Sequence, residues 1–286
     1  MEQSSKVRHL DILRNLAGFD EWLTELGVPV RRSDRAHNAI RILEKAQHAF
    51  ANRLDGGDAG ISNSEYLFGL TEALELQDVY RAFRNHPPQA LRERLSRALS
   101  GPVLPEAETV KNRDGRNIMF ELALGAEWAL QGFPVELLEP DLLLRAPNAN
   151  YLVACKRPDH EHGIGAAVRS AASQLRVALS SSPDNYLGII AISLSCALNR
   201  GRTFYSGRFE QLSKLLSGKM TEHRPSWRTI NFHPRNIAIH FHAHTPADWG
   251  EGLFRLSAAL VGPTLSEGVI HQCLKDDIHL MNQRNR

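Results

Sequence analysis

The sequence predicts an α/β protein, with α+β as the alternative, in which a helical N-terminal region precedes a mixed sheet flanked by helices. Two observations support this prediction. Up to about residue 100, apolar residues recur near helical spacing, as in residues 10–16 and 40–46. Beyond residue 105, helix-like segments and short apolar runs typical of strands follow one another, which favours helices layered on a sheet.

The N-terminal region is expected to contain helices and no strand. Ser62, with Glu65 three residues later, has the pattern of a capping box that opens a helix. The segment 101–105 contains a glycine and two prolines and cannot continue a helix. We therefore predict a boundary there, with a helical region at 1–105 and a second domain at 106–286.

The second domain is predicted from a change in hydrophobic period. Its expected elements are a buried helix at 117–131, strands at 135–144 and 151–157 around a turn, a helix at 164–179, and strands at 186–194 and 237–242. The first helix is apolar on nearly every side, which indicates that it is buried. This order predicts helices packed against a sheet.

Composition limits the classes of protein that fit. Of the 286 residues, 42% are apolar and 23% charged, and the net charge is only +2, so any DNA-binding face must be local. The three cysteines are too few and scattered for a disulfide framework. The start of the chain lacks the apolar core of a signal peptide, and no run approaches the roughly 18 apolar residues of a membrane span. We expect a soluble, cytoplasmic protein that does not contact a membrane.

Three charged residues stand where apolar residues would be expected. Glu121 interrupts the buried helix, Asp141 follows a proline within a strand-like run, and Lys156 ends an apolar strand. Each also fits a structural role: Glu121 could pair with Arg116 or Arg113, Asp141 could cap a turn, and Lys156 could extend out of the strand end. Because side chains alternate along a strand, Lys156 is expected to share a face with residue 154.

The order of these residues resembles the PD-(D/E)XK nuclease superfamily, of restriction-endonuclease-like fold. The motif here reads Pro140-Asp141, then Ala154-Cys155-Lys156, after a helix that carries a glutamate. The resemblance covers about residues 110–200. It includes the helix after the lysine strand, in which Gln174 matches a glutamine found in several branches of the superfamily.

The resemblance implies a metal-dependent endonuclease that cuts DNA, with Mg²⁺ or Mn²⁺ as cofactor. Asp141 would be the central metal ligand, and Glu121 would bind or orient a second ion or a metal-bound water. Lys156 would position the attacking water or stabilise charge on the phosphate. Gln174 would orient the site or contact DNA. Such proteins often serve in restriction, repair or antiviral defence, and those that cut both strands usually pair, so a homodimer or a partner on the N-terminal helices is plausible.

The chain departs from the family at Ala154, where an aspartate or glutamate is expected, so one metal ligand is missing. Three explanations stand. Position 154 could carry an inactivating substitution, or the protein could be a degenerate nuclease that binds without cutting. Alternatively, the carboxylate could come from elsewhere, with Glu121, Asp159 and Glu161 as candidates. The second explanation corresponds to a catalytically inactive, nuclease-fold module that regulates by binding DNA or protein.

Basic residues suggest where nucleic acid would bind. Arg169 and Arg176 are seven residues apart on the helix after the lysine strand and so share a face, and Arg157 follows Lys156. A further basic stretch, with aromatic residues among the cations, comprises Arg200, Arg202, Arg208, Lys214, Lys219, His223, Arg224 and Arg228. A solvated surface explains such patterns equally well.

Three histidines alternate at positions 240, 242 and 244 and would face one side of a strand. Neutral imidazole suits zinc or iron, so the rival hypothesis is a metal-dependent hydrolase or oxygenase that uses this cluster. That hypothesis requires a nearby carboxylate or fourth histidine, for which Asp248 and His233 are the candidates. The simpler interpretation is a half-exposed strand.

Overall fold

The computed structural model describes residues 3–6, 9–52, 60–109, 114–199, 205–206, 209–227, 229–248, 253–263, 272 and 274–277. The N-terminal elements are β1 (Gln3–Lys6), α1 (His9–Asn15), α2 (Phe19–Glu25), α3 (Arg35–Ala51), α4 (Asn63–Phe83) and α5 (Leu91–Ala98). The later elements are α6 (Asp114–Leu130), β2 (Val135–Leu137), β3 (Leu142–Arg145), β4 (Asn150–Lys156), α7 (Ile164–Ser180), β5 (Tyr186–Ser193), α8 (Ser195–Asn199), β6 (Tyr205–Ser206), α9 (Phe209–Trp227), β7 (Asn236–Asp248) and β8 (Leu253–Pro263). Among the described helices, none combines the length and apolarity needed to cross a membrane.

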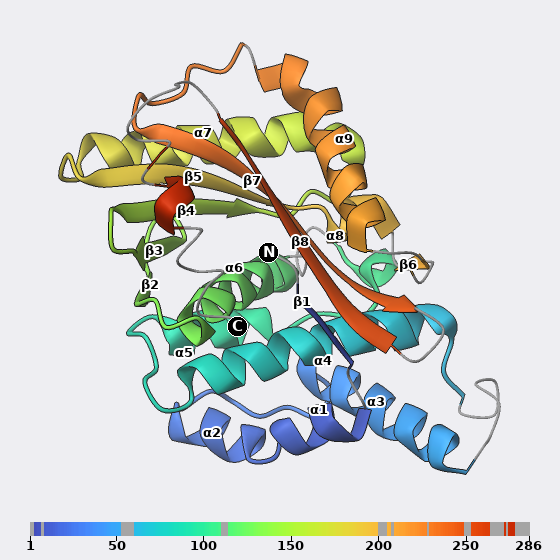
Figure 1. Cartoon of the computed structure of the whole chain (residues 1–286). Helices are drawn as coiled ribbons and strands as arrows, with labels where there is room; N and C mark the ends of the chain where they lie inside the picture. The colour runs from blue at the N-terminus through green and yellow to red at the C-terminus, as the bar shows by residue number, and fades with distance from the viewer. Residues whose placement is uncertain are drawn as a thin grey trace.

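The strands form one mixed sheet in the order β1-β8-β7-β5-β4-β3-β2, with β6 paired to β7 (Figure 1). Its centre is parallel, because β5 pairs in parallel with both β4 and β7. Both flanks of the sheet are antiparallel. On one flank β2 pairs with β3 and β3 with β4, and on the other β1 pairs with β8 and β8 with β7. Parallel neighbours need a crossover, and α7 supplies it between β4 and β5.

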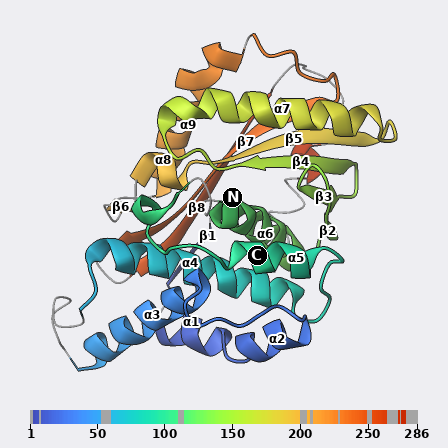
Figure 2. The ribbon, with the colours of Figure 1, turned by 180° about the vertical axis from the view of Figure 1, so that it is seen from behind.

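Helices cover both faces of the sheet, which confirms the predicted α/β class with a mixed sheet flanked by helices. Figure 2 shows α7 and α9 on one side and α6, α4 and α5 on the other. Side chains alternate between the two faces, as β4 illustrates: Tyr151, Val153 and Cys155 join the core beneath α6, while Leu152 and Ala154 join the core beneath α7.

Helix α4 begins where the sequence predicts. Ser62 accepts a hydrogen bond from the Glu65 backbone, and the Glu65 carboxylate accepts one from the Ser62 backbone, so the capping box is confirmed. The expectation of helices alone was wrong, because residues 3–6 form β1. This strand is polar in sequence and takes its order from backbone pairing with β8, so it leaves no apolar period to find.

The run 135–144, predicted as one strand, is two strands of a tight hairpin. Val135 lies opposite Leu144 and Leu137 opposite Leu142, so the chain reverses over residues 138–141. Pro140 lies in this turn and follows a cis peptide bond. A second hairpin joins β3 to β4 at the predicted turn. Asp141 is therefore the last residue of a turn and not the middle of a strand.

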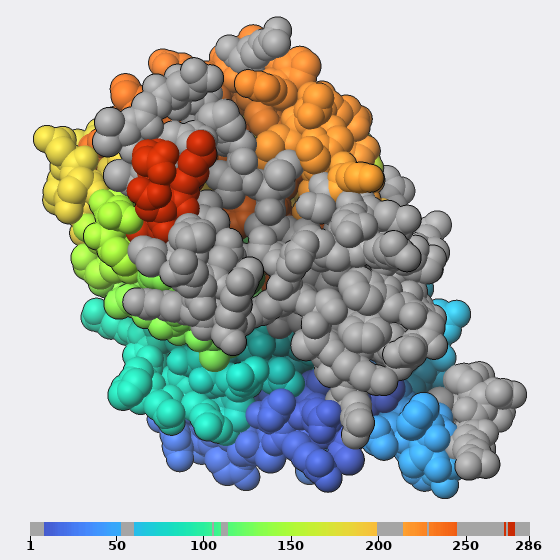
Figure 3. All heavy atoms as spheres, viewed as in Figure 1, coloured from blue at the N-terminus to red at the C-terminus, as the bar shows by residue number. Residues whose placement is uncertain are grey.

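The apolar core runs across the predicted boundary near residue 105. The cluster beneath α6 contains side chains from α1 to α5 and from strands β2 to β5 and β7. In the space-filling view, the cyan and teal helical segment lies directly against the green segment of the hairpins (Figure 3). The boundary at 105 thus marks a change in secondary structure within a shared core.

Candidate functional site

The structure brings Asp141 and Lys156 together at the end of the second hairpin. One Asp141 carboxylate oxygen accepts a hydrogen bond of 2.6 Å from the Cys155 backbone N–H. The Lys156 ammonium lies 3.7 Å from the same oxygen and donates to the Cys155 carbonyl at 2.8 Å. The Asp141 side chain thus takes the place of a ladder acceptor at the point where β3 begins.

Glu121 of α6 lies beside this pair. Burial and then the Asp141 carboxylate raise the pKa of Glu121 to about 7, against the lowering effects of Arg94 and Lys156. Its nearest partner is Arg94 of α5, whose guanidinium forms an ion pair with it and also donates to the Leu138 carbonyl at 3.1 Å. The structural alternative considered for Glu121, a pair with Arg116 or Arg113, was therefore wrong for Arg116, which bonds Glu108; Arg113 lies outside the described residues.

The pKa of Asp141 is also subject to opposing effects. Burial raises the pKa of its carboxyl group, while Lys156 and the Cys155 N–H favour the charged form. The site therefore holds two buried carboxyl groups that disfavour each other's ionisation and two cations that offset them. Hard oxygen ligands in such an arrangement suit a divalent cation such as Mg²⁺, because added positive charge would relieve the repulsion.

The close approach of hairpin and helix depends on Gly125, one turn after Glu121 on α6. A Cβ atom at this position would lie 3.2 Å from Val135 and 3.3 Å from Leu142. The missing side chain lets β2 and β3 pack directly on the helix. Glu121 and Asp141 are held near each other by this contact.

Ala154 is fully buried and belongs to the apolar cluster beneath α7. Leu142 pairs with Val153, so the β3–β4 register, continued by one residue, places residue 154 opposite Asp141. Of the proposed substitute carboxylates, Glu121 lies at the site, whereas Glu161 bonds Lys219 of α9 at 2.7 Å and Asp159 is exposed.

The other residues implied by the resemblance lie apart from the acidic pair. Gln174 is exposed on α7 and lines a surface groove with Glu139 and Pro140. Arg169 and Arg176 are also exposed on α7, on the opposite face of the sheet from α6, and Arg176 donates to the Asn231 carbonyl. Within the described structure, no hydrogen bond or ion pair joins any of the three to Asp141 or Glu121.

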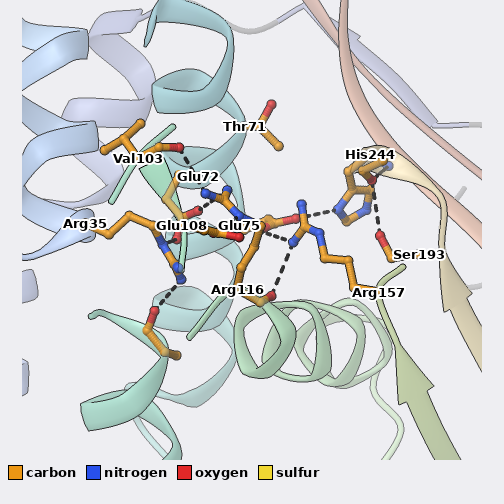
Figure 4. A network of polar contacts seen from close by, with 12 residues as sticks. Arg35, Thr71, Glu72, Glu75, Val103, Glu108, Arg116, Arg157, Ser193 and His244 are labelled. Atoms are coloured by element: carbon orange, nitrogen blue, oxygen red, sulfur yellow. Dashed lines mark hydrogen bonds and ion pairs between the residues drawn. The ribbon is translucent and has the colours of Figure 1, made fainter. Parts of the chain in front are cut away.

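Arg157 was expected to contact DNA, and its position contradicts that expectation. It is 8% exposed and donates to the Arg116 carbonyl at 3.3 Å, with Glu75 of α4 at 3.8 Å (Figure 4). Its side chain cannot reach a ligand on the surface. The strand parity that sends Lys156 to one face sends Arg157 to the other, where it meets α4 and α6.

Arg157 belongs to a buried network that joins the N-terminal helices to the sheet. Arg35 of α3 is fully buried and bonds Glu72 of α4 at 2.7 Å, and Arg116 bonds Glu108 at 2.6 Å with Glu72 at 3.8 Å (Figure 4). Burying any one of these charges alone would cost free energy, and the ion pairs offset that cost.

The alternating histidines meet two carboxylates that the sequence did not suggest. Glu127 of α6 lies 3.1 Å from Nε2 of His242 and 3.8 Å from Nε2 of His244. Nδ1 of His244 lies 3.5 Å from Glu75. Burial opposes ionisation of Glu127, but hydrogen bonds from the two imidazoles hold its pKa well below the usual range.

The candidate fourth histidine for this cluster, His233, is held elsewhere. His233 instead accepts a hydrogen bond from the Arg235 backbone at 3.2 Å in the loop before β7. The side chain of Asp248 lies outside the described structure. Glu127 and Glu75 could have been suspected, because each interrupts an apolar helix as Glu121 does.

The basic stretch after residue 200 is only partly described. Lys214 and Arg224 are exposed on α9, and Lys219 bonds Glu161 and Glu222. The side chains of Arg200, Arg202, Arg208 and Arg228 lie outside the described residues.

Comparisons of the chain with protein-family models, with curated proteins and with solved structures find no match.

Proposed function

We propose that the chain is a metal-dependent phosphodiester hydrolase of nuclease type, weakened by alanine at position 154, with DNA as substrate. The observation that carries the proposal is the meeting of Glu121, Asp141 and Lys156, which lie far apart in sequence, at one hairpin end. Mg²⁺ or Mn²⁺ would be held by the two carboxylates, and the metal would polarise the phosphate and supply hydroxide.

Each residue has a role that follows from its contacts. Asp141 is fixed by the Cys155 N–H, which leaves its second oxygen for a cation. Lys156 lies close enough to orient a water or to offset charge on the phosphate. Arg94 neutralises Glu121 when no cation is present, and a cation would compete with it for the same carboxylate.

The second candidate is a nuclease-fold module that binds DNA or protein without cutting. The burial of Ala154 favours it, because an apolar contact has replaced the expected ligand at the position opposite Asp141. On this view the site retains charge but lacks the third carboxylate that hydrolysis in this family would use.

Plasmid cleavage in Mg²⁺ or Mn²⁺ tests both candidates. The chain is compared with Ala154→Glu and with three double variants. These combine Ala154→Glu with Asp141→Ala, with Lys156→Ala or, as a matched control on the exposed side of β2, with Glu136→Gln. We expect Ala154→Glu to raise cleavage about a hundredfold or more, and either second change to remove it, while the Glu136 control cuts normally.

The alternatives give different results. Cleavage by the unaltered chain that Glu121→Gln abolishes would show that Glu121 supplies the ligand. If no variant cuts but gel shifts show DNA bound, with weaker binding after Arg169→Glu, the binding module is supported. If no variant cuts and none binds DNA, the nuclease fails and so does the DNA-binding form of the second candidate.

A further inference from the structure

A second polar centre lies on α6, separate from the acidic pair. Glu127 follows Glu121 by six residues, so the two carboxylates are about 9 Å apart along the helix and about 120° apart around it. Glu127 faces β7, where His242 and His244 alternate onto the same side of the sheet. One ligand atom from each of these three residues lies within 4.8 Å of the others.

The spacing matches the coordination sphere of a small transition-metal ion. Zinc bonds of about 2.0–2.2 Å to nitrogen and oxygen place the ligand atoms of a tetrahedral site about 3.4 Å apart. The Glu127 oxygen lies 3.1 Å from His242 Nε2 and 3.8 Å from His244 Nε2, on either side of that value. Small side-chain rotations would bring all three atoms to bonding distance of one ion.

The surroundings orient the ligands as metal sites do. A ligating histidine usually gives its other ring nitrogen to a carboxylate, which fixes the tautomer and the direction of the ring. Glu75 occupies that position for His244, at 3.5 Å from Nδ1, and leaves Nε2 pointing toward Glu127. Glu75 is itself held by Arg157, whose guanidinium lies 3.8 Å from its second carboxylate oxygen.

A further imidazole adjoins the cluster. The His240 ring lies with its centroid 5.9 Å from that of His242, nearly perpendicular to it. Its Nε2 atom is buried and has no hydrogen-bond partner in the described structure. A buried nitrogen without a partner is costly, and a bound ion with its water would supply one.

We propose that Glu127, His242 and His244 bind a divalent transition-metal ion of the zinc class, with Glu75 as the outer partner of His244. Two imidazoles and one carboxylate favour zinc over Mg²⁺, which prefers an all-oxygen shell. Three protein ligands leave a coordination position for water. This site is independent of the proposed nuclease activity, because it shares no ligand with Asp141, Glu121 or Lys156.

The test uses the full chain without a histidine tag, stripped of metal by a chelator and dialysed. Zn²⁺ binding is measured by calorimetry, and Co²⁺ is added as a spectroscopic probe whose visible bands report coordination by nitrogen and oxygen. The variants are Glu127→Gln, which is isosteric, His242→Gln and His244→Gln, with Glu75→Gln for the outer partner. His86→Gln, an exposed histidine after α4, controls for the other histidines of the chain.

We expect one Zn²⁺ per chain, and a loss of affinity of about a hundredfold or more in each ligand variant. Glu75→Gln should weaken binding about ten- to hundredfold and shift the Co²⁺ bands. The His86→Gln variant should bind as the unaltered chain does. Circular dichroism of the metal-free variants checks that they fold.

Two results would overturn the proposal. The first is the absence of stoichiometric Zn²⁺ or Co²⁺ binding by the folded, unaltered chain. The second is unchanged affinity in Glu127→Gln and His244→Gln, which would place the metal on other histidines. Loss of DNA cleavage alone bears on the Asp141 site, whereas these readouts require no enzymatic activity, so failure of either proposal is recognised separately.

Discussion

Arg94 of α5 forms an ion pair with Glu121 of α6 and so neutralises a carboxylate that also faces Asp141. The cation comes from the N-terminal helices, and the acids come from the helix and hairpin of the second half of the chain. Charge balance at the candidate nuclease site is therefore a property of the tertiary fold.

Replacing Arg94 with methionine should make stability more dependent on pH. Glu121 has its pKa raised from 4.5 to about 7 in the folded protein, so the folded state holds this proton more tightly than the unfolded chain. Its contribution is complete below about pH 4.5 and is lost as pH rises through about 7, at most about 3 kcal/mol. Without Arg94 the pKa rises further, and the loss grows.

Urea unfolding in chelator at about pH 5 and about pH 8 measures this effect. The Arg94→Met variant should lose more stability at the higher pH. Adding Glu121→Gln, either to the unaltered chain or to Arg94→Met, should reduce the difference in stability between the two pH values. Arg92→Met, at an exposed position of the same helix, is the control. Equal losses at both pH values would mean that Arg94 acts through packing and not through charge.

Introducing glutamate at position 154 should destabilise the metal-free protein and make it respond to Mg²⁺. The new carboxylate would enter a fully buried, apolar position, at a cost of about 2 kcal/mol or more. Because it would lie opposite Asp141, saturating Mg²⁺ should restore at least about 1 kcal/mol. Thermal unfolding with and without Mg²⁺ checks this, and Ala154→Gln, which brings the same volume but no charge, should not respond.

Arg35 should be among the most costly cations to remove. The side chain is fully buried, bonds Glu72 at 2.7 Å and also donates to the Ala98 carbonyl. Arg35→Met would leave Glu72 with only Arg116, at 3.8 Å, so we expect a loss of about 3–5 kcal/mol in urea unfolding. The double variant with Glu72→Leu should recover part of that loss. A single-variant loss below about 1 kcal/mol would contradict this account.

Two glycines should respond in opposite directions. Gly125→Val adds atoms where a Cβ already meets Val135 and Leu142 at 3.2 and 3.3 Å, so we expect a loss of about 1–3 kcal/mol. Gly218, exposed in α9, has nothing within 4 Å of an added Cβ, and Gly218→Ala should gain about 0.5–1 kcal/mol from helix propensity. Denaturant midpoints compare the two, and stabilisation by Gly125→Val would refute the proposed tight contact.

Much of the fold could be predicted because its signals are local. The helices now seen as α6 and α7 and the strand β5 were predicted within a few residues, since each has a clear hydrophobic period. β1 was missed because a polar edge strand owes its form to pairing with β8. The run 135–144 has the pattern of one strand because its residues are mostly apolar on both sides of the turn.

The site could be predicted only from charged residues that lie within apolar segments. Three such residues are Glu121, Asp141 and Lys156, and the structure places them together. Glu127 and Glu75 also lie among apolar residues of their helices. Arg94 lies on a helix that is largely polar, where a charge is ordinary, so no local pattern could reveal its partner. Spacing along a chain does not tell which distant helix will supply a counter-ion.

The core that continues across residue 105 makes the two halves of the chain interdependent. Arg94 and Glu75 precede that point, while Glu121, Asp141 and His244 follow it. A fragment beginning at 106 would expose the apolar face of α6 that packs on the N-terminal helices, and Glu121 would lose its partner Arg94. Truncation or exchange of segments at this position would therefore separate Arg94 from Glu121 and Glu75 from His244.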